Sequence, residues 1–300
     1  ISGVGARNRD NFLRMTTTAS SLLLFRASAL LLALVVPAVC AQQISPFAET
    51  KLTARDPAMF DEFGIKLAIS EEWAAVVAKG NHKNKDRGSV YMYRLSGGVW
   101  EQTTKLTAPN EEKGDGFEFG SAVGISGTRL VVTGSYATKT FRTPDGLEAE
   151  WFGALYVFEL TEDVWELTAK LWKQERYLHI DRPFYDFGHT VAIESDRVVV
   201  AVHDRPVKDD DGNYDDYNLL YVYDLMNGEW LETARLVGPR SELILWHFSS
   251  ERYHFVTFAM SGARLIYGSG LDDNNGTHAG AANIFELTDG EWLQTASLTA

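Results

Sequence analysis

Cysteine is almost absent from this sequence. Among its 300 residues there is one, Cys40, and the region from residue 42 to residue 300 has none. That region therefore has no disulfide bond and no thiol nucleophile. Its stability must come from a large packed core, and a composition that is 45% hydrophobic and 12% aromatic is sufficient to build one.

The chain is also poor in basic residues. It has 28 Lys and Arg against 41 Asp and Glu, which gives a formal net charge of -13. An acidic protein of this kind is a poor partner for nucleic acid or for an anionic membrane. We therefore expect no nucleic-acid binding, and membrane attachment only through an anchor outside these 300 residues.

Catalytic signals are missing as well. The seven histidines fall in no spacing typical of metal ligands, and the neighbours His203 and Asp204 are of a kind that is usually structural. The sequence therefore predicts a protein that is not an enzyme and that carries no cofactor.

No apolar run is long enough to span a bilayer. Residues 15–41 begin at Met15 and end in small residues around Cys40. Between them lies an apolar run from Leu30 to Val36, which Arg26 separates from the apolar residues before it. This pattern predicts a cleaved signal peptide, in preference to a transmembrane anchor or a lipoprotein signal. Residues 1–14 precede the first methionine and are treated as upstream sequence. We expect a secreted protein or one on the extracellular surface.

What the sequence does have is an internal repeat. Four segments, at about 60–108, 117–172, 184–237 and 248–300, share one order of motifs, and their tryptophans at 100, 165, 230 and 292 recur every 62 or 65 residues. Each contains four short runs rich in Val, Ile, Leu and Tyr. In the third segment they lie at about Thr190–Glu194, Val198–Val202, Leu219–Leu225 and Trp230–Leu236. The pattern predicts an all-β β-propeller built from four-stranded blades.

The repeat resembles the FG-GAP family, which builds the propellers of integrin α-chains. The resemblance depends on the Phe-Gly openings at Phe63, Phe119 and Phe187, on the third strand G-x-x-Y-V-F, and on the fourth strand W-x-x-x-x-K-L-T-A; the fourth segment has Phe255-Val256 at its opening. Kelch repeats are disfavoured because no Gly-Gly doublet closes the second strand. The family implies a seven-bladed ring and a role in adhesion. It covers residues 47–300.

Residues 47–54 match the end of a fourth strand but follow no preceding three. In closed propellers such an orphan strand completes the last blade. We therefore expect four blades of a truncated seven-bladed ring, within a propeller domain over residues 42–300.

The predicted binding face is the one that carries long loops. Loops Ser135–Gly153 and His203–Asn218 lie on one face, and tight turns such as Ser195-Asp196 lie on the other. Exposed aromatic residues beside charges favour a protein or glycan ligand. The candidates are Tyr136, Phe141, Trp151, Phe152, Tyr214 and Tyr217. The alternatives are that Trp151 and Phe152 pack beneath their own loop, and that this face holds the site of a propeller hydrolase or oxidoreductase.

Calcium is a weaker hypothesis. Asp209, Asp211 and Asp215 form an acidic loop, and Asp272 with Asp273 forms another, but neither has the D-x-D-x-D-G spacing. In integrin-like blades the calcium loop lies between the first and second strands, where this chain has only short turns, so the resemblance does not transfer it. Asn275-Gly276-Thr277 fits a glycosylation acceptor and equally a turn.

Overall fold

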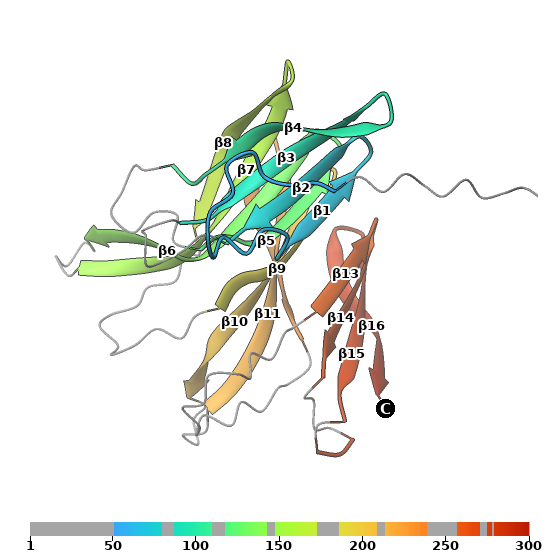
Figure 1. The fold of residues 1–300 in the computed structure, drawn as a ribbon. Helices are drawn as coiled ribbons and strands as arrows, with labels where there is room; N and C mark the ends of the chain where they lie inside the picture. Colours follow the sequence, from blue (N-terminus) through green and yellow to red (C-terminus); the bar gives the residue numbers. More distant parts are fainter. Residues whose placement is uncertain are drawn as a thin grey trace, which may run out of the picture. The chain divides into compact units, whose positions relative to one another are not determined.

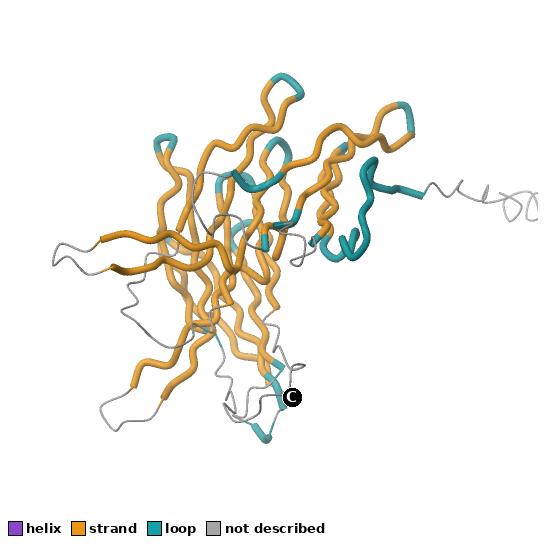
Figure 2. The backbone as a smooth tube through the Cα atoms, turned by 60° about the vertical axis from the view of Figure 1, so that its left-hand side comes forward, coloured by secondary structure: helices purple, strands orange, loops and turns teal. Residues whose placement is uncertain are grey.

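The computed structural model describes residues 51–79, 87–109, 118–142, 148–172, 186–208, 214–238, 257–270, 275–277 and 279–299. These residues form sixteen strands, and none of them is helical (Figures 1 and 2). The described part of the chain accordingly has no helix that could cross a membrane. The predicted signal peptide, and residues 47–50 of the orphan strand, lie outside the described residues.

The strands form four antiparallel sheets of four, here called sheets 1 to 4 in chain order (Figure 1). Sheet 1 has β1 (Leu67–Ser70), β2 (Trp73–Ala78), β3 (Ser89–Ser96) and β4 (Val99–Leu106). Sheet 2 has β5 (Phe119–Ser126), β6 (Arg129–Arg142), β7 (Glu148–Thr161) and β8 (Val164–Trp172). Sheet 3 has β9 (Asp186–Glu194), β10 (Arg197–Lys208), β11 (Tyr214–Met226) and β12 (Glu229–Val237). Sheet 4 has β13 (Thr257–Ser261), β14 (Arg264–Ser269), β15 (Ala281–Thr288) and β16 (Glu291–Thr299).

Each sheet is a simple meander, because its strands pair in the order in which they occur along the chain. This is the four-stranded blade that the repeat predicts, and it confirms the all-β β-propeller class. The four tryptophans occupy one equivalent position: each is the second residue of a fourth strand and pairs with a leucine of the third strand.

The tight turns follow from residues that tolerate a left-handed backbone. The turns between third and fourth strands have two consecutive residues with positive φ, as in Asn227-Gly228 at 53° and 85° and Asp289-Gly290 at 52° and 85°. Two such residues make a type I′ hairpin, whose twist matches that of the flanking strands. The short connections predicted at these points are confirmed.

Every fourth strand contains the same irregularity. One extra residue interrupts the pairing of the third and fourth strands in each sheet, and in all four it is a threonine. The hydroxyl of each donates to a third-strand carbonyl opposite, at 3.2 to 3.5 Å. A bulge of this kind adds one residue to one strand without ending the sheet. The four threonines are Thr103, Thr168, Thr233 and Thr295.

The prediction of long loops at Ser135–Gly153 and His203–Asn218 was wrong. Most of both segments is strand: β6 and β7 continue to the pair Arg142 and Glu148, and β10 and β11 to the pair Lys208 and Tyr214. The predicted second and third strands of sheet 3 were correspondingly too short. The two strands of a hairpin satisfy each other's backbone groups, so a hairpin can form without the apolar alternation that marks a packed strand in the sequence.

The hydrophobic core lies between consecutive sheets. The front face of a sheet is defined here as the one toward the preceding sheet, and the back face as the one toward the following sheet. Between sheets 1 and 2, one cluster joins Ala75 and Val77 on the back of sheet 1 to Phe119 and Tyr156 on the front of sheet 2. Equivalent clusters join sheets 2 and 3 and sheets 3 and 4. No sheet buries its apolar side chains alone, so the repeats stabilise one another.

The Phe-Gly opening is explained by this packing. Phe119 and Phe187 lie at the start of β5 and β9 and are buried, and the glycine after each has a positive φ, 97° at Gly120 and 76° at Gly188. A Cβ on Gly120 would lie 2.5 Å from Val77 of sheet 1, and one on Gly188 would lie 2.6 Å from Thr133 of sheet 2. Only glycine fits both the backbone conformation and the space.

Thr133 is the one polar residue in this series of contacts, and its removal gives a testable result. Its buried hydroxyl donates to the carbonyl of Gly188 and accepts from the N–H of Ala122 at 2.8 Å. Thr133→Val keeps the shape but leaves both backbone groups without this partner, so we expect the free energy of unfolding to fall by about 1–3 kcal/mol. Urea titration measures it. The exposed Thr107→Val should change nothing, and equal losses in the two variants would contradict this account.

Candidate binding face

Two hairpins are much longer than their counterparts in the other sheets. β6 and β7 have 14 residues each, and β10 and β11 have 12 and 13, whereas the same strands of sheets 1 and 4 have only 6 and 8. The extra length lies at the ends of the strands away from the tight turns (Figure 1). Sheets 2 and 3 therefore present an additional ribbon on the face for which the sequence predicts binding.

The aromatic candidates all belong to the strands of these two hairpins. In sheet 2, Phe141 pairs with Ala149, Trp151 with Lys139 and Phe152 with Thr138, while Tyr136 lies in the irregular part of β6 between Gly134 and Thr138. In sheet 3, Tyr214 pairs with Lys208 and Tyr217 with Asp204. Each set thus belongs to one hairpin, and the two hairpins are on adjacent repeats.

Of the acidic and glycosylation candidates, the structure describes only Asp215 and Asn275. Asp215 lies on β11 opposite Val207, whereas Asp209, Asp211, Asp272 and Asp273 lie outside the described residues. Within the described part of the chain, no three His, Cys, Asp or Glu residues are grouped so as to hold a metal ion. Asn275 is exposed in a short turn, where Gly276 has a φ of 135°.

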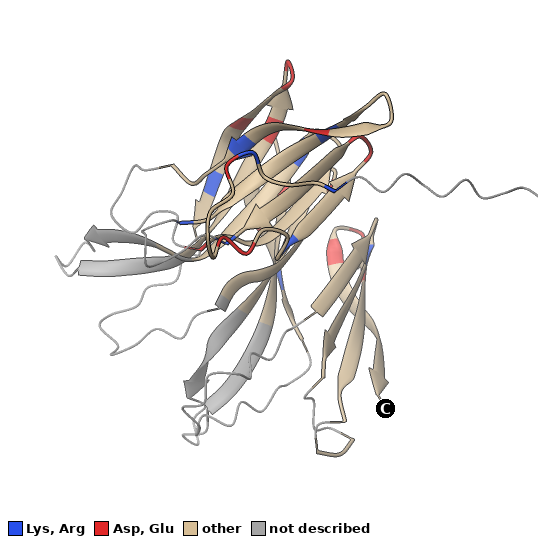
Figure 3. Ribbon diagram, viewed as in Figure 1, with Lys and Arg blue, Asp and Glu red and all other residues tan. Residues whose placement is uncertain are grey.

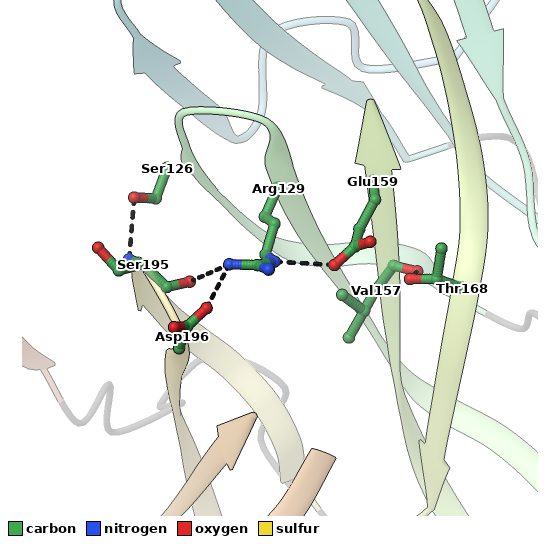
Figure 4. A network of polar contacts seen from close by, with 7 residues as sticks. All are labelled: Ser126, Arg129, Val157, Glu159, Thr168, Ser195 and Asp196. Carbon is green, nitrogen blue, oxygen red and sulfur yellow. Dashed lines mark hydrogen bonds and ion pairs between the residues drawn. The ribbon is translucent and has the colours of Figure 1, made fainter. Parts of the chain in front are cut away.

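The opposite face holds a polar network that joins sheets 2 and 3 (Figure 4). Arg129 contacts Glu159 of its own sheet at 2.8 Å, and Asp196 and the carbonyl of Ser195 in sheet 3 at 2.5 and 3.3 Å. The Glu159 carboxylate stabilises the charged guanidinium and so raises the pKa of Arg129. Since each charge has an internal partner, the network positions the two sheets.

A second series of contacts connects every consecutive pair of sheets, and we call these contacts turn links. The last side chain of a first strand accepts a hydrogen bond from a backbone N–H in the first turn of the next sheet. The pairs are Ser70 with Gly127 at 3.0 Å, Ser126 with Ser195 at 3.1 Å, and Glu194 with Gly262 at 2.6 Å. The three donors share a φ of 52° to 57°, so one turn geometry makes the link each time.

The sequence reasoning missed a recurring pair of residues in each sheet. One is the first residue of the second strand, and the other is the residue opposite it on the third strand. In sheets 2 to 4 an arginine there contacts an acidic residue across the strands, as Arg129 does with Glu159. Sheet 1 has a different pair: Trp73 takes the arginine position, and Arg94 takes the position of the acidic residue, 5.4 Å from the Trp73 ring. Arg94 also contacts Glu72 and, across the interface, Asp163. Opposite charges are thus interspersed along this end of the sheets (Figure 3). The recurrence of Arg129, Arg197 and Arg264 was the available signal.

The recurring sheets, Phe-Gly openings and tryptophan positions have a counterpart among known repeats. The sequence profile described as the FG-GAP repeat matches residues 47–93 and 100–158. The chain is an FG-GAP repeat protein.

Solved structures similar to this FG-GAP repeat protein share little sequence with it. One, a candidate 6-phosphogluconolactonase from Bacteroides fragilis, is 12% identical with a TM-score of 0.37, over 79% of this chain and 71% of that one. Another, YjhT, is 10% identical with a TM-score of 0.37, over 81% of this chain and 66% of that one. No curated protein matches the FG-GAP repeat protein by sequence.

Proposed function

We propose that this FG-GAP repeat protein is an exported binding module without catalytic activity, and that it engages a protein or a glycan through the β6–β7 and β10–β11 hairpins. The observation that carries the proposal is the extension of these two hairpins, on one face, beyond the strand lengths of sheets 1 and 4. Hairpin length that differs from one repeat to the next is free to vary with a ligand.

Two further features support it. The opposite face is occupied by turn links and by the Arg129 network, which connect the sheets to one another. The sheets behind the hairpins are joined by buried apolar clusters, which provide the rigid scaffold that a binding face requires. The predicted signal peptide at residues 15–41 supports a secreted or surface-displayed location.

The experiment replaces one aromatic residue on each hairpin. We expect Trp151→Ala and Tyr214→Ala to weaken binding to a glycan array or an extracellular-protein array by about 30-fold or more each, because large aromatic residues dominate interfaces. Folding should be unchanged in both variants, as measured by circular dichroism and urea titration.

Matched controls lie on the tight turns of the opposite face. Asn227→Gly and Asp289→Asn preserve a left-handed backbone, and we expect both to bind as the unmodified chain does. If they alone lose binding, the face is wrongly assigned. If a captured ligand is hydrolysed or oxidised at the same face, the non-catalytic assignment is wrong, although the location stands.

A further inference from the structure

The sequence contains two Asn-Gly pairs, and both asparagines are exposed. Asn227 and Gly228 connect β11 to β12, whereas Asn275 and Gly276 lie between β14 and β15. An asparagine followed by glycine is especially prone to lose its side-chain amide, because glycine has no side chain to shield its backbone nitrogen. The structure gives the two pairs different backbone conformations, and this difference separates their chemistry.

The reaction is an attack by the backbone on the side chain. The nitrogen of the glycine gives up its proton to solvent base and attacks the asparagine Cγ. The N–Cγ bond forms, the Cγ–Nδ2 bond breaks, and Nδ2 leaves as ammonia. Water then opens the five-membered succinimide at either carbonyl, which gives aspartate or isoaspartate. No reactant other than water is needed, but the glycine nitrogen and the asparagine Cγ must lie on the same side of the Cα–C bond.

The β11–β12 hairpin holds Asn227 in a conformation that prevents this ring closure. Its φ of 53°, followed by 85° at Gly228, is that of a type I′ turn, in which the first central residue has a ψ of about 30°. At that angle the Gly228 nitrogen lies nearly anti to the Asn227 Cβ about the Cα–C bond, so it cannot reach Cγ. The pairing of Met226 with Glu229 on either side fixes the turn.

Asn275 is not under that constraint. Its φ is not positive, so the pair is not a type I′ turn, and the last pair between β14 and β15 is Ser269 with Ala281. Among the described residues this turn has one hydrogen bond, from the Ala279 N–H to the Gly276 carbonyl at 3.0 Å, which leaves rotation about the Asn275 Cα–C bond open. A Cβ on Gly276 would meet only the Ala279 Cβ, at 3.9 Å.

We propose that Asn275 is a site of spontaneous modification, at which the folded protein converts the side-chain amide to a carboxylate through a succinimide. Asn227 has the same Asn-Gly sequence and is equally open to solvent, but it keeps its amide because of its turn. At Asn275 the conversion replaces a neutral group with a negative charge, and the isoaspartate product also adds one methylene to the main chain.

The site lies in the connection between the second and third strands of sheet 4. The β6–β7 and β10–β11 hairpins extend the same connection in sheets 2 and 3. Conversion of Asn275 therefore puts a carboxylate at the end of the sheets for which binding is proposed. The reaction itself depends on the local backbone alone and stands independently of the proposed function.

Glycosylation and this conversion exclude each other. Asn275-Gly276-Thr277 is also a glycan acceptor sequence, and a glycan would be attached to the same Nδ2 that leaves as ammonia. The experiment therefore uses protein from a bacterial host that adds no N-linked glycan.

The experiment compares the two pairs within one molecule. The folded protein is incubated in mildly alkaline buffer, and each asparagine is followed by peptide mass spectrometry and by labelling with an isoaspartate methyltransferase. We expect Asn275 to convert about tenfold faster than Asn227 or more, because Asn227 reacts only when its hairpin opens. In urea that unfolds the chain the two rates should become similar, since the Asn-Gly sequence alone then sets them.

Two variants are the controls. Asp289→Asn makes a further Asn-Gly pair in a turn of matched geometry, with φ of 52° and 85°, and should convert as slowly as Asn227. Asn275→Gln should remove the fast conversion and leave the circular dichroism spectrum unchanged. Equal rates at Asn227 and Asn275 in the folded chain overturn the proposal. So does an Asn275 amide that survives in the folded protein over the time in which the unfolded chain loses it.

Discussion

Gly188→Ala should lower the free energy of unfolding by about 2–5 kcal/mol. Two costs combine: a left-handed backbone with a Cβ costs about 1–2 kcal/mol, and overpacking costs about 1–3 kcal/mol more. The overpacking arises because the new Cβ would lie 2.6 Å from Thr133 of the preceding sheet.

Gly64→Ala is the control that separates the two costs. Gly64 has the same motif position and a φ of 95°, but a Cβ there meets nothing within 4 Å. We therefore expect a loss of about 1–2 kcal/mol, from the backbone alone. Urea titration of the two variants side by side measures the difference. If the losses are equal, the glycines of the Phe-Gly openings are required for their backbone conformation only, and close contact between sheets has no part in their selection.

Phe119→Ala should cost about 3–5 kcal/mol, because it empties a fully buried site between sheets 1 and 2. The Phe119 ring packs edge-on against Tyr156 and Phe158, with centroids 5.1 and 6.2 Å apart. Neither sheet is able to collapse into the cavity without moving the other. Thermal and urea unfolding should both show the loss.

Phe63→Ala gives the comparison within the same motif. Phe63 makes similar edge-on contacts with Tyr91 and Tyr93, at 5.5 and 6.5 Å, but it is only partly buried because no described sheet lies in front of it. Its removal should cost about half as much as that of Phe119. A loss as large as that of Phe119 would mean that the front of sheet 1 is covered in solution.

The sequence was sufficient to predict the sheets because the repeat tests each assignment four times. Trp100 and its three equivalents indicated one fourth strand each, and the register confirms that they are equivalent. Phe119 and Phe187 indicated where the innermost strands start. A single copy of any of these signals would have been ambiguous, since short apolar runs do not distinguish strand from buried helix.

The hairpin extensions could not be predicted in the same way. They occur in two repeats and have no fixed length, so no comparison between repeats exposes them. Their strands, such as Thr138–Arg142, also lack the apolar alternation that a core imposes. The pair of Trp73 and Arg94 was missed for a related reason. The residue types at these two positions differ from those in the other repeats, so the positions look unrelated until the partner strand is known.

The threonine bulge has a consequence for how one strand serves two neighbours. Trp165 and Leu171 are six residues apart, an even spacing that in a regular strand puts both side chains on one side. Here Thr168 inverts the parity midway: Trp165 packs toward sheet 1, and Leu171 packs toward sheet 3. Trp230 and Leu236 divide in the same way around Thr233. The first half of each such fourth strand therefore packs in one interface between sheets, and the second half packs in the next. Deleting that single threonine would turn both side chains to the same side.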